Sequence, residues 1–257
     1  MKSVDVIIVN YRTPDLSKQA CDSVLTDPAV NKVWIVDNSS ADDSCQLLQK
    51  YAAGKPVEVI SSTENLGFGE ANNLAAKKST ARYIFLLNSD ATLFAGNLES
   101  LVDNLEQAES VGIVAPQILL TDEQAVQLDA QGIFPTASRI IFRKTRQYIQ
   151  SQTPDWVSGV SLLVRREEFL NIGGFDKEYF MYFEDVDLCW RYRQSGKKIV
   201  VVPEVKVVHL GGGSHSSTSK QKQTYFSSQR LFLRKSGAGR ITLLLLKIIT
   251  WIYGKRY

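Results

Sequence analysis

The sequence predicts an α/β fold in which a mostly parallel sheet is flanked by helices and followed by a helical tail. The first observation is a series of short, almost wholly apolar runs, as expected of strands buried on both faces: residues 4–9, 33–36, 57–60, 83–87 and 112–115. The second observation is a helical pattern between consecutive runs. Strand and helix in alternation favour right-handed crossovers, and these produce parallel strands.

The helical patterns of the first half follow in order. The first begins at Thr13, a candidate N-cap, with Pro14 at the first helical position. Three further patterns carry apolar residues at helical spacing: Leu47, Leu48 and Tyr51; Ala71, Leu74 and Ala75; Leu98, Leu101, Val102 and Leu105. The alternation stops near residue 116, and residues 117–155 give no assignment.

The second half resumes with an apolar strand at residues 160–164 and a short helix closed by Gly173 and Gly174. A helix is predicted over residues 184–194, and Gly196 follows it as the residue that ends the helical pattern. Two strands follow, over residues 199–202 and 205–210.

The amino-acid composition excludes several classes of protein. The 257 residues hold 30 Lys plus Arg against 27 Asp plus Glu, a net charge of only +3, which disfavours a dedicated nucleic-acid binder. Three widely spaced cysteines support neither a disulfide framework nor a Cys-pair zinc site, and they fit a reducing compartment. The N-terminal apolar stretch is too short and too polar for a signal peptide, so we expect a cytoplasmic protein.

The C-terminal tail contains an apolar stretch of 13 residues, 241–253, interrupted by Lys247. It is shorter than the roughly 20 residues that cross a bilayer. Its basic flanks, with Trp251 and Tyr253, favour a helix lying on the inner face of the cell membrane. A helix packed onto the domain or into a homodimer explains the pattern equally well.

Polar residues follow four of the predicted strands. In open α/β sheets, ligands bind beyond the carboxyl ends of the strands. The tips are Asn10, Tyr11 and Arg12; Asp37, Asn38, Ser39 and Ser40; Glu64, Asn65, Gly67 and Gly69; and Asn88, Ser89 and Asp90. Ordinary loop-forming residues explain any one tip, but less easily all four.

Three groups offer chemistry. Asn88 and Asp90 supply hard oxygen ligands for Mg²⁺ or Mn²⁺, although a turn or helix cap is the simpler interpretation of the triplet alone. His209 ends a strand before three glycines and could complete a metal site, whereas His215 reads as a surface residue.

The third group is the acidic stretch that opens the helix at residue 184. Only Asp185 falls on its apolar face, with Met181, Leu188, Cys189 and Tyr192. Apolar surroundings raise the pKa of a carboxyl towards a value useful for a general base. We assign Asp187 to an ordinary ion pair with Arg191 four residues on.

In this order, the motifs resemble family-two glycosyltransferases, and most closely the bacterial rhamnosyltransferase-like branch. The resemblance covers residues 3–215 and rests on Val6–Tyr11, Val36–Ser40, Asn65–Gly69 with Asn72, Leu87–Asp90, Gly173–Asp176, Phe183–Leu188 and His209. It implies the GT-A fold and direct inverting transfer. It also implies a nucleotide-sugar-binding half at residues 1–116, an acceptor-binding half at 117–215 and a tail at 216–257.

The resemblance also implies roles for individual residues. Asp37 would contact a pyrimidine nucleobase, and Asn88 and Asp90 would match the family's Asp-x-Asp pair. Asp185 would match the catalytic general base, and His209 would match a residue later in the chain that contacts the cation. The remaining residues of the nucleotide-sugar pocket would be Asn10, Tyr11, Asn38, Asn65, Gly67, Asn72 and Ser89. The residues that contact the donor sugar and the acceptor would be Trp156, Ser158, Gly159 and Glu184. Asn88 departs from the pattern, because it removes one negative charge near the metal.

These implications give an inverting, metal-assisted transferase that uses a dTDP- or UDP-sugar. dTDP-rhamnose is the donor to which the branch points, and a glycan or lipid-linked hydroxyl is the acceptor. One alternative is a catalytically inactive sugar-nucleotide-binding or glycan-binding subunit of a polysaccharide assembly complex, favoured by Asn88. A pyrophosphorylase or other Rossmann-like enzyme fits poorly, because residues 10–14 lack the glycines of a phosphate loop.

Overall fold

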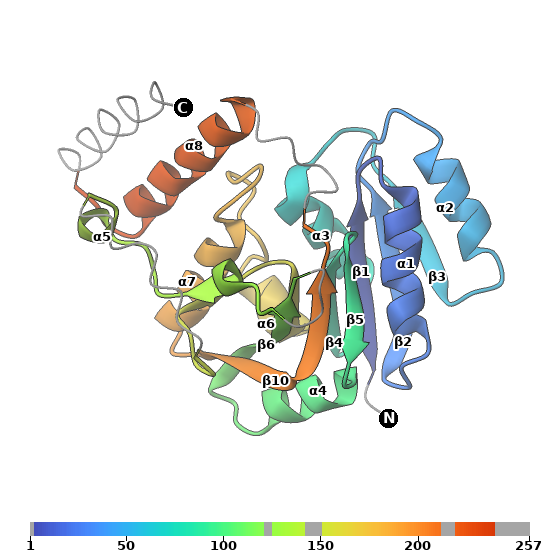
Figure 1. Cartoon of the computed structure of the whole chain (residues 1–257), viewed down its shortest axis with the longest axis horizontal. Coiled ribbons are helices and arrows are strands. Elements are labelled where there is room, and N and C mark those ends of the chain that lie inside the picture. The colour runs from blue at the N-terminus through green and yellow to red at the C-terminus, as the bar shows by residue number, and fades with distance from the viewer. Residues whose placement is uncertain (1–2, 121–124, 142–150, 212–218, 240–257) are drawn as a thin grey trace.

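A computed structural model describes residues 3–120, 125–141, 151–211 and 219–239. Its centre is an eight-stranded sheet in the order β3-β2-β1-β4-β9-β6-β10-β5 (Figure 1). Helices α1, α2 and α4 pack on one face, and α3, α6 and α7 pack on the other. The layered α/β architecture predicted from the sequence is therefore confirmed.

The N-terminal half follows the predicted alternation. Its strands are parallel to one another, and the helices connect them. The elements are β1 (Val4–Asn10), α1 (Pro14–Leu25), β2 (Val30–Asp37), α2 (Ser44–Ala52), β3 (Val57–Ser61), α3 (Gly67–Lys78) and β4 (Tyr83–Asn88). Strand β3 differs from the expectation of burial on both faces, because it is the edge strand and its side chains are half-buried or exposed.

The second half makes the sheet mixed. Strand β9 (Ser161–Arg165) runs antiparallel between β4 and β6 (Val111–Leu119). After a turn, β4 is followed by β5 (Ala91–Ala95), which the sequence did not predict, and then by α4 (Leu98–Glu106). Strand β5 pairs antiparallel with β10 (Lys198–His209).

The two strands predicted over residues 199–202 and 205–210 are one strand, so that prediction was wrong. Pro203 and Glu204 interrupt the pairing with β6 as a register shift between Val202 and Lys206, and the strand continues beyond it. A bulge of this kind bends a strand without ending it.

The stretch that the sequence left unassigned contains short elements beside the sheet. They are η1 (Leu128–Ala130), β7 (Gln131–Gly132), α5 (Ala137–Ile141) and β8 (Trp156–Val157). Strands β7 and β8 pair as a separate two-stranded sheet. Each of these elements is too short to show a helical or strand-like pattern of apolar residues, so the sequence did not predict them.

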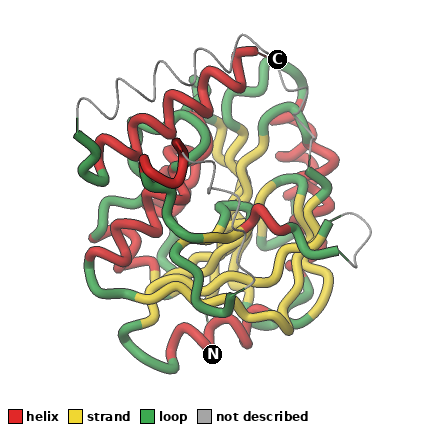
Figure 2. Tube along the Cα trace, turned by 60° about the vertical axis from the view of Figure 1, so that its left-hand side comes forward, coloured by secondary structure: helices red, strands yellow, loops and turns green. Residues whose placement is uncertain are grey.

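The last part of the chain holds α6 (Arg166–Asn171), α7 (Glu184–Gln194) and α8 (Ser219–Lys235). Helix α8 packs through Phe232 and Leu233 against Tyr179, Phe183 and Val186, and it lies apart from the central sheet (Figures 1 and 2). The helix expected over residues 241–253 lies outside the described residues. Among the residues described, no helix is long and apolar enough to cross a membrane.

Candidate active site

The ends of β1 and β2 are joined by a buried polar network. The Nδ2 of Asn10 donates to Oδ1 of Asp37 over 2.8 Å, and the Oδ1 of Asn10 accepts from Ser17 Oγ over 2.8 Å. Both Asn10 and Asp37 are buried. Asn10 therefore holds the Asp37 carboxylate in one orientation at the carboxyl edge of the sheet.

A second amide clamp ties β2 to the start of α3. Asn38 donates through Nδ2 to Asn65 Oδ1 and to the carbonyl of Gly67, each over 3.1 Å. Gly67 has φ +76°, and a Cβ there would lie 2.2 Å from the carbonyl oxygen of Phe180. Only glycine therefore permits the N-terminus of α3 to approach the segment before α7 so closely.

The side chain of Tyr11 reaches solvent. It is 39% exposed, and the Arg12 guanidinium carbon lies 5.2 Å from the centre of its ring. The exposed part of the Tyr11 ring can stack against the ring of a ligand. Asn72, in contrast, is buried and donates to the carbonyl of Phe68 one turn back in α3, so its amide serves the helix.

The turn after β4 brings Asp90 and His209 together. Strand register places His209 opposite Ala91, and the Leu210 N–H donates to the Asp90 carbonyl over 2.9 Å. The Nε2 of His209 lies 3.3 Å from Oδ1 of Asp90. Next to Asp90, Ser89 Oγ lies 3.4 Å from Thr13 Oγ1 at the start of α1.

This carboxylate and imidazole fit a divalent cation. No cluster of three or more Asp, Glu, His or Cys occurs in the described part of the chain that could cage an ion entirely with protein ligands. Magnesium is commonly held by one or two carboxylates together with substrate phosphates, and so few protein ligands suit it. The Oδ1 of Asn88 is buried and has no hydrogen-bond partner among the described residues, which leaves an oxygen for a ligand.

Asp185 lies at the start of α7 against a tight loop. Its Oδ2 accepts the Gly159 N–H over 3.0 Å, and its Oδ1 accepts the Val186 N–H over 2.8 Å. Burial raises the pKa of Asp185, while these backbone donors and the Ser158 hydroxyl work in the opposite direction. The structure thus brings together Asp185, Ser158 and Gly159, to which the sequence analysis gave separate roles.

Glu184 corrects one expectation. Asp185 was expected to be the only acid of the stretch on an apolar face, but Glu184 and Asp187 are buried and Asp185 is half-buried. Burial and the neighbouring Asp185 charge raise the pKa of Glu184 well above its ordinary value, and its Oε2 has no partner among the described residues. The ion pair predicted for Asp187 is confirmed, with Arg191 Nε 2.7 Å from Oδ2.

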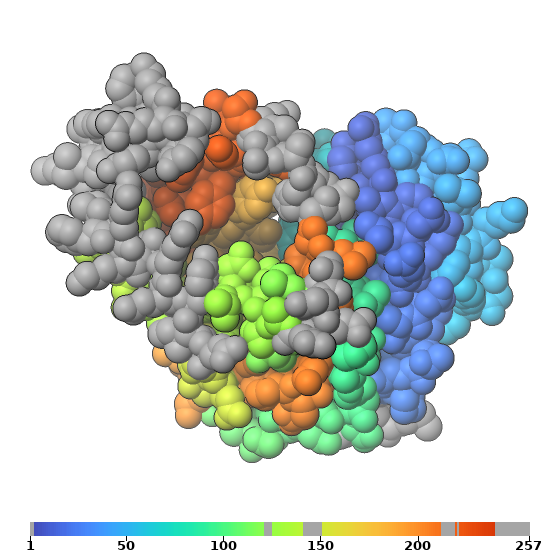
Figure 3. Space-filling view, viewed as in Figure 1, coloured from blue at the N-terminus to red at the C-terminus, as the bar shows by residue number. Residues whose placement is uncertain are grey.

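One loop joins the cation side of the site to the base side. The Asn88 N–H donates to the Val160 carbonyl over 2.9 Å, and the adjacent Gly159 donates to Asp185. Asp185 and Asn88, two residues before Asp90, are therefore held by the same loop at the carboxyl end of β4. The space-filling view shows a hollow between α8 and the strands (Figure 3).

The segment before α7 has a strained backbone. Tyr182 and Phe183 have φ of +68° and +67°, a left-handed conformation that bulky residues rarely adopt. Helix α8 holds this segment, because Ser228 Oγ donates to the Met181 carbonyl over 2.8 Å and Lys235 pairs with Asp176. Such strain concentrates at functional sites, where the surrounding structure maintains it.

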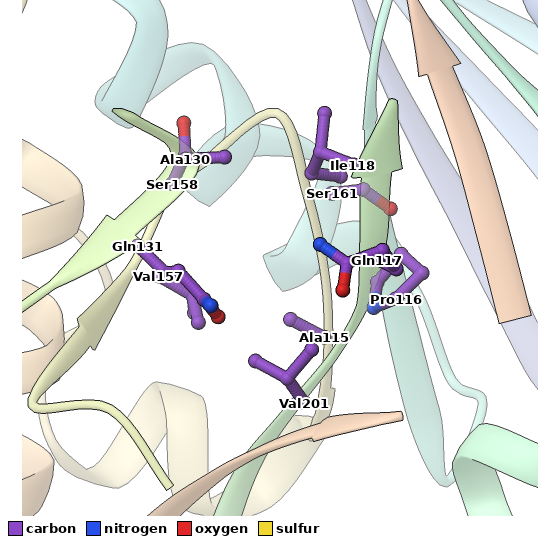
Figure 4. A pocket seen from close by; sticks show the side chains of 10 residues that line it. All are labelled: Ala115, Pro116, Gln117, Ile118, Ala130, Gln131, Val157, Ser158, Ser161 and Val201. Carbon is purple, nitrogen blue, oxygen red and sulfur yellow. The ribbon is translucent and has the colours of Figure 1, made fainter. Parts of the chain in front are cut away.

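A cavity of about 10 Å³ lies behind the loop, between β6 and the β7–β8 pair (Figure 4). Ser158, Ser161 and Gln131 contribute to its lining, and Ser161 Oγ is buried with no partner among the described residues. This space suits about one water molecule and is far too small for a nucleotide. Trp156 does not line this cavity. Its indole N–H donates to the Ile133 carbonyl, and its ring packs over Gly132.

Taken with the fold, this edge of the sheet defines an enzyme class, the glycosyltransferases that use nucleotide-sugar donors. The chain belongs to glycosyl transferase family 2, whose family model matches residues 5–170. It is 29% identical over 225 residues to rhamnosyltransferase WbbL of Escherichia coli, covering 80% of this chain and 83% of that protein. It is 27% identical over 234 residues to the N-acetylglucosaminyl-diphospho-decaprenol L-rhamnosyltransferase of Mycobacterium tuberculosis, covering 79% and 75%.

A solved structure supports the fold. The mannosyltransferase PcManGT of Pyrobaculum calidifontis, in complex with GDP-Man and Mn²⁺, superposes with a TM-score of 0.66 at 17% identity. The match covers 98% of this chain and 70% of that one. The expected GT-A fold is confirmed, and the chain is a glycosyltransferase of the rhamnosyltransferase-like branch.

Proposed function

We propose that the chain transfers a sugar, with inversion, from a nucleotide diphosphate to an acceptor hydroxyl, with Asp185 as general base. The observation that carries the proposal is the loop shared by Asn88, Gly159 and Asp185. It keeps a carboxylate on the acceptor side at a fixed place relative to the residues expected to hold the leaving group.

Asp37 and the amide clamp of Asn38 and Asn65 would form the nucleotide end of the site. The Asp37 carboxylate is oriented by Asn10, which leaves acceptor lone pairs for the N–H groups of a base. Tyr11, with its exposed ring, would cover the nucleotide.

Asp90 and His209 would hold Mg²⁺ or Mn²⁺ at the diphosphate. When bound, the cation neutralises the charge that develops on the departing nucleotide diphosphate. The PcManGT structure, which shares the fold, holds Mn²⁺ together with GDP-Man, and this favours a divalent cation as the partner of the diphosphate. Because Asn88 is neutral, Asp90 supplies the only carboxylate of the Asn88–Asp90 triplet, so Asp90→Ala removes the main protein charge holding the ion.

Asp185 would remove the proton of the attacking hydroxyl. The Gly159 and Val186 N–H groups fix the carboxylate and stabilise its ionised form. A raised pKa brings such a base closer to the pH at which proton removal is efficient.

The acceptor would approach along a groove of about 400 Å³ between α8 and the segment before α7. Glu178, Phe180, Thr224, Ser227 and Leu231 contribute to its lining, and the Phe180 ring is 50% exposed. An exposed aromatic face among hydroxyl and carboxylate groups suits a sugar ring. Phe180→Ala should raise the KM for the acceptor severalfold and leave that for the donor unchanged; an equal change in both would remove the groove from the acceptor path.

The names of the two rhamnosyltransferase relatives favour rhamnose as the transferred sugar, and the second name favours a lipid-linked acceptor. dTDP-rhamnose is the donor that the family resemblance implies. Nucleotide release with a panel of nucleotide sugars, each with Mg²⁺ or Mn²⁺, tests the donor. Calorimetry of nucleotide binding to the wild type and to Asp90→Ala, with and without Mg²⁺, tests the metal. Equal affinities in all four titrations would refute the metal role.

A further inference from the structure

His209 has a polar side chain beside each of its two ring nitrogens. On one side its Nε2 lies 3.3 Å from Asp90. On the other side its Nδ1 lies 2.9 Å from Oε1 of Gln127, which the sequence analysis did not single out. Both His209 and Gln127 are half-buried.

The partner on Nδ1 determines where the ring proton lies. An amide oxygen can only accept, so facing Gln127 Oε1 the Nδ1 atom carries the hydrogen. A neutral ring with its proton on Nδ1 presents a lone pair at Nε2, directed to the side of Asp90. A lone pair and a carboxylate oxygen side by side are two ligands that one cation can share.

Backbone hydrogen bonds hold Gln127 in place. Its N–H donates to the Ile118 carbonyl over 2.9 Å, and its carbonyl accepts from Ala130. The neighbouring Val126 forms a bridge with Leu119 at the end of β6. The side chain is therefore presented to His209 from a fixed point on the sheet.

We propose that Gln127 is a positioning residue, which keeps His209 in the Nδ1–H tautomer so that Nε2 binds the cation together with Asp90. This rests on the proposed cation role of that pair. Partners that orient a metal-binding histidine change metal affinity by about 10-fold to 100-fold when they are removed.

Two substitutions separate the hydrogen bond from the shape of the side chain. Gln127→Leu keeps similar bulk but removes the acceptor, and it should weaken Mn²⁺ binding by about 10-fold to 100-fold in calorimetry. Gln127→Glu retains an acceptor at the same place and should preserve the affinity. Gln107→Leu, at an exposed position after α4, is the matched control and should bind Mn²⁺ as the wild type does.

The tautomer is measured independently of any cation. The chain has only two histidines, so ¹⁵N-histidine labelling of the full chain gives two ring systems, assigned with His215→Gln. Each spectrum is recorded with Asp90→Ala added, because the Asp90 carboxylate can only accept and would draw the ring proton to Nε2. At about pH 8.5, where neutral rings are the ordinary form, we then expect His209 to be protonated on Nδ1 when Gln127 is unchanged and with Gln127→Glu. In Gln127→Leu we expect the Nε2–H form to gain population.

The outcomes distinguish this inference from the function beneath it. His209 protonated on Nε2 in Asp90→Ala, or Gln127→Leu with unchanged tautomer and unchanged Mn²⁺ affinity, overturns the role of Gln127. The predicted tautomer shift on Gln127→Leu, combined with a wild type that binds no Mn²⁺, supports the hydrogen bond but overturns its proposed purpose, together with the cation role of Asp90 and His209.

Discussion

Replacing Glu184 by glutamine should change how the stability of the protein depends on pH. The Glu184 side chain is buried, its Oε2 has no partner among the described residues, and the Asp185 carboxylate lies beside it. Burial and that charge raise the pKa of Glu184 well above the value of about 4.3 found for glutamate in an unfolded chain. The folded protein therefore keeps this proton to a higher pH than the unfolded chain does.

The sign of the effect follows from linkage. Between the unfolded and the folded pKa, the native state binds more protons, so the free energy of unfolding falls as the pH rises. One proton contributes a slope of up to about 1.4 kcal/mol per pH unit. The stabilisation is complete below about pH 4.3 and is lost above the raised pKa of Glu184. Glutamine has the same shape but no proton to lose, so Glu184→Gln removes this slope.

Urea unfolding between about pH 4.5 and pH 7.5 measures the difference. Relative to the wild type, Glu184→Gln should become steadily more stable as the pH rises across the window. Glu109→Gln, on an exposed loop, is the control and should follow the wild type. Parallel curves for the wild type and Glu184→Gln would refute the claim that the buried acid is protonated in the native state.

Two further changes test how the site is held. Gly67→Ala should cost about 2–5 kcal/mol, since a left-handed backbone costs about 1–2 kcal/mol and its Cβ would lie 2.2 Å from a carbonyl oxygen. Gly54→Ala, with φ +76° but open space, should cost only the backbone part in urea unfolding, and equal losses would contradict the close approach. Asp187→Ala should cost about 3–5 kcal/mol because it leaves Arg191 without its buried partner. The same change at exposed Asp15 should cost under about 1 kcal/mol, and a similar loss in both would show that the Asp187 pair is not specially stabilising.

The first half of the fold was predictable because its signals are local. The apolar runs ending at Asn10, Asp37 and Asn88 stand out, and the polar residues after them lie where parallel strands end. Helix α7 was predicted with its bounds, because Gly196 and the acidic first turn mark its ends.

The remainder depends on contacts between distant residues. The pairing that puts His209 beside Asp90 comes from the register of β10 on β5, a strand that the sequence did not predict. The burial of Glu184 could not be read from helical spacing, because its face of α7 is covered by the chain around Gly69 and Phe175. Gln127 gave no signal at all in its own stretch of sequence.

Transfer by Asp185→Asn is the most direct measurement of the central claim, that this carboxylate removes the proton of the acceptor hydroxyl. Asparagine keeps the shape of the side chain and cannot act as a base. Turnover should fall about 10²-fold or more, while calorimetry shows nucleotide-sugar affinity within a factor of about 2 of the wild type. Turnover close to that of the wild type, with donor binding intact, would contradict the account and assign the base to another residue.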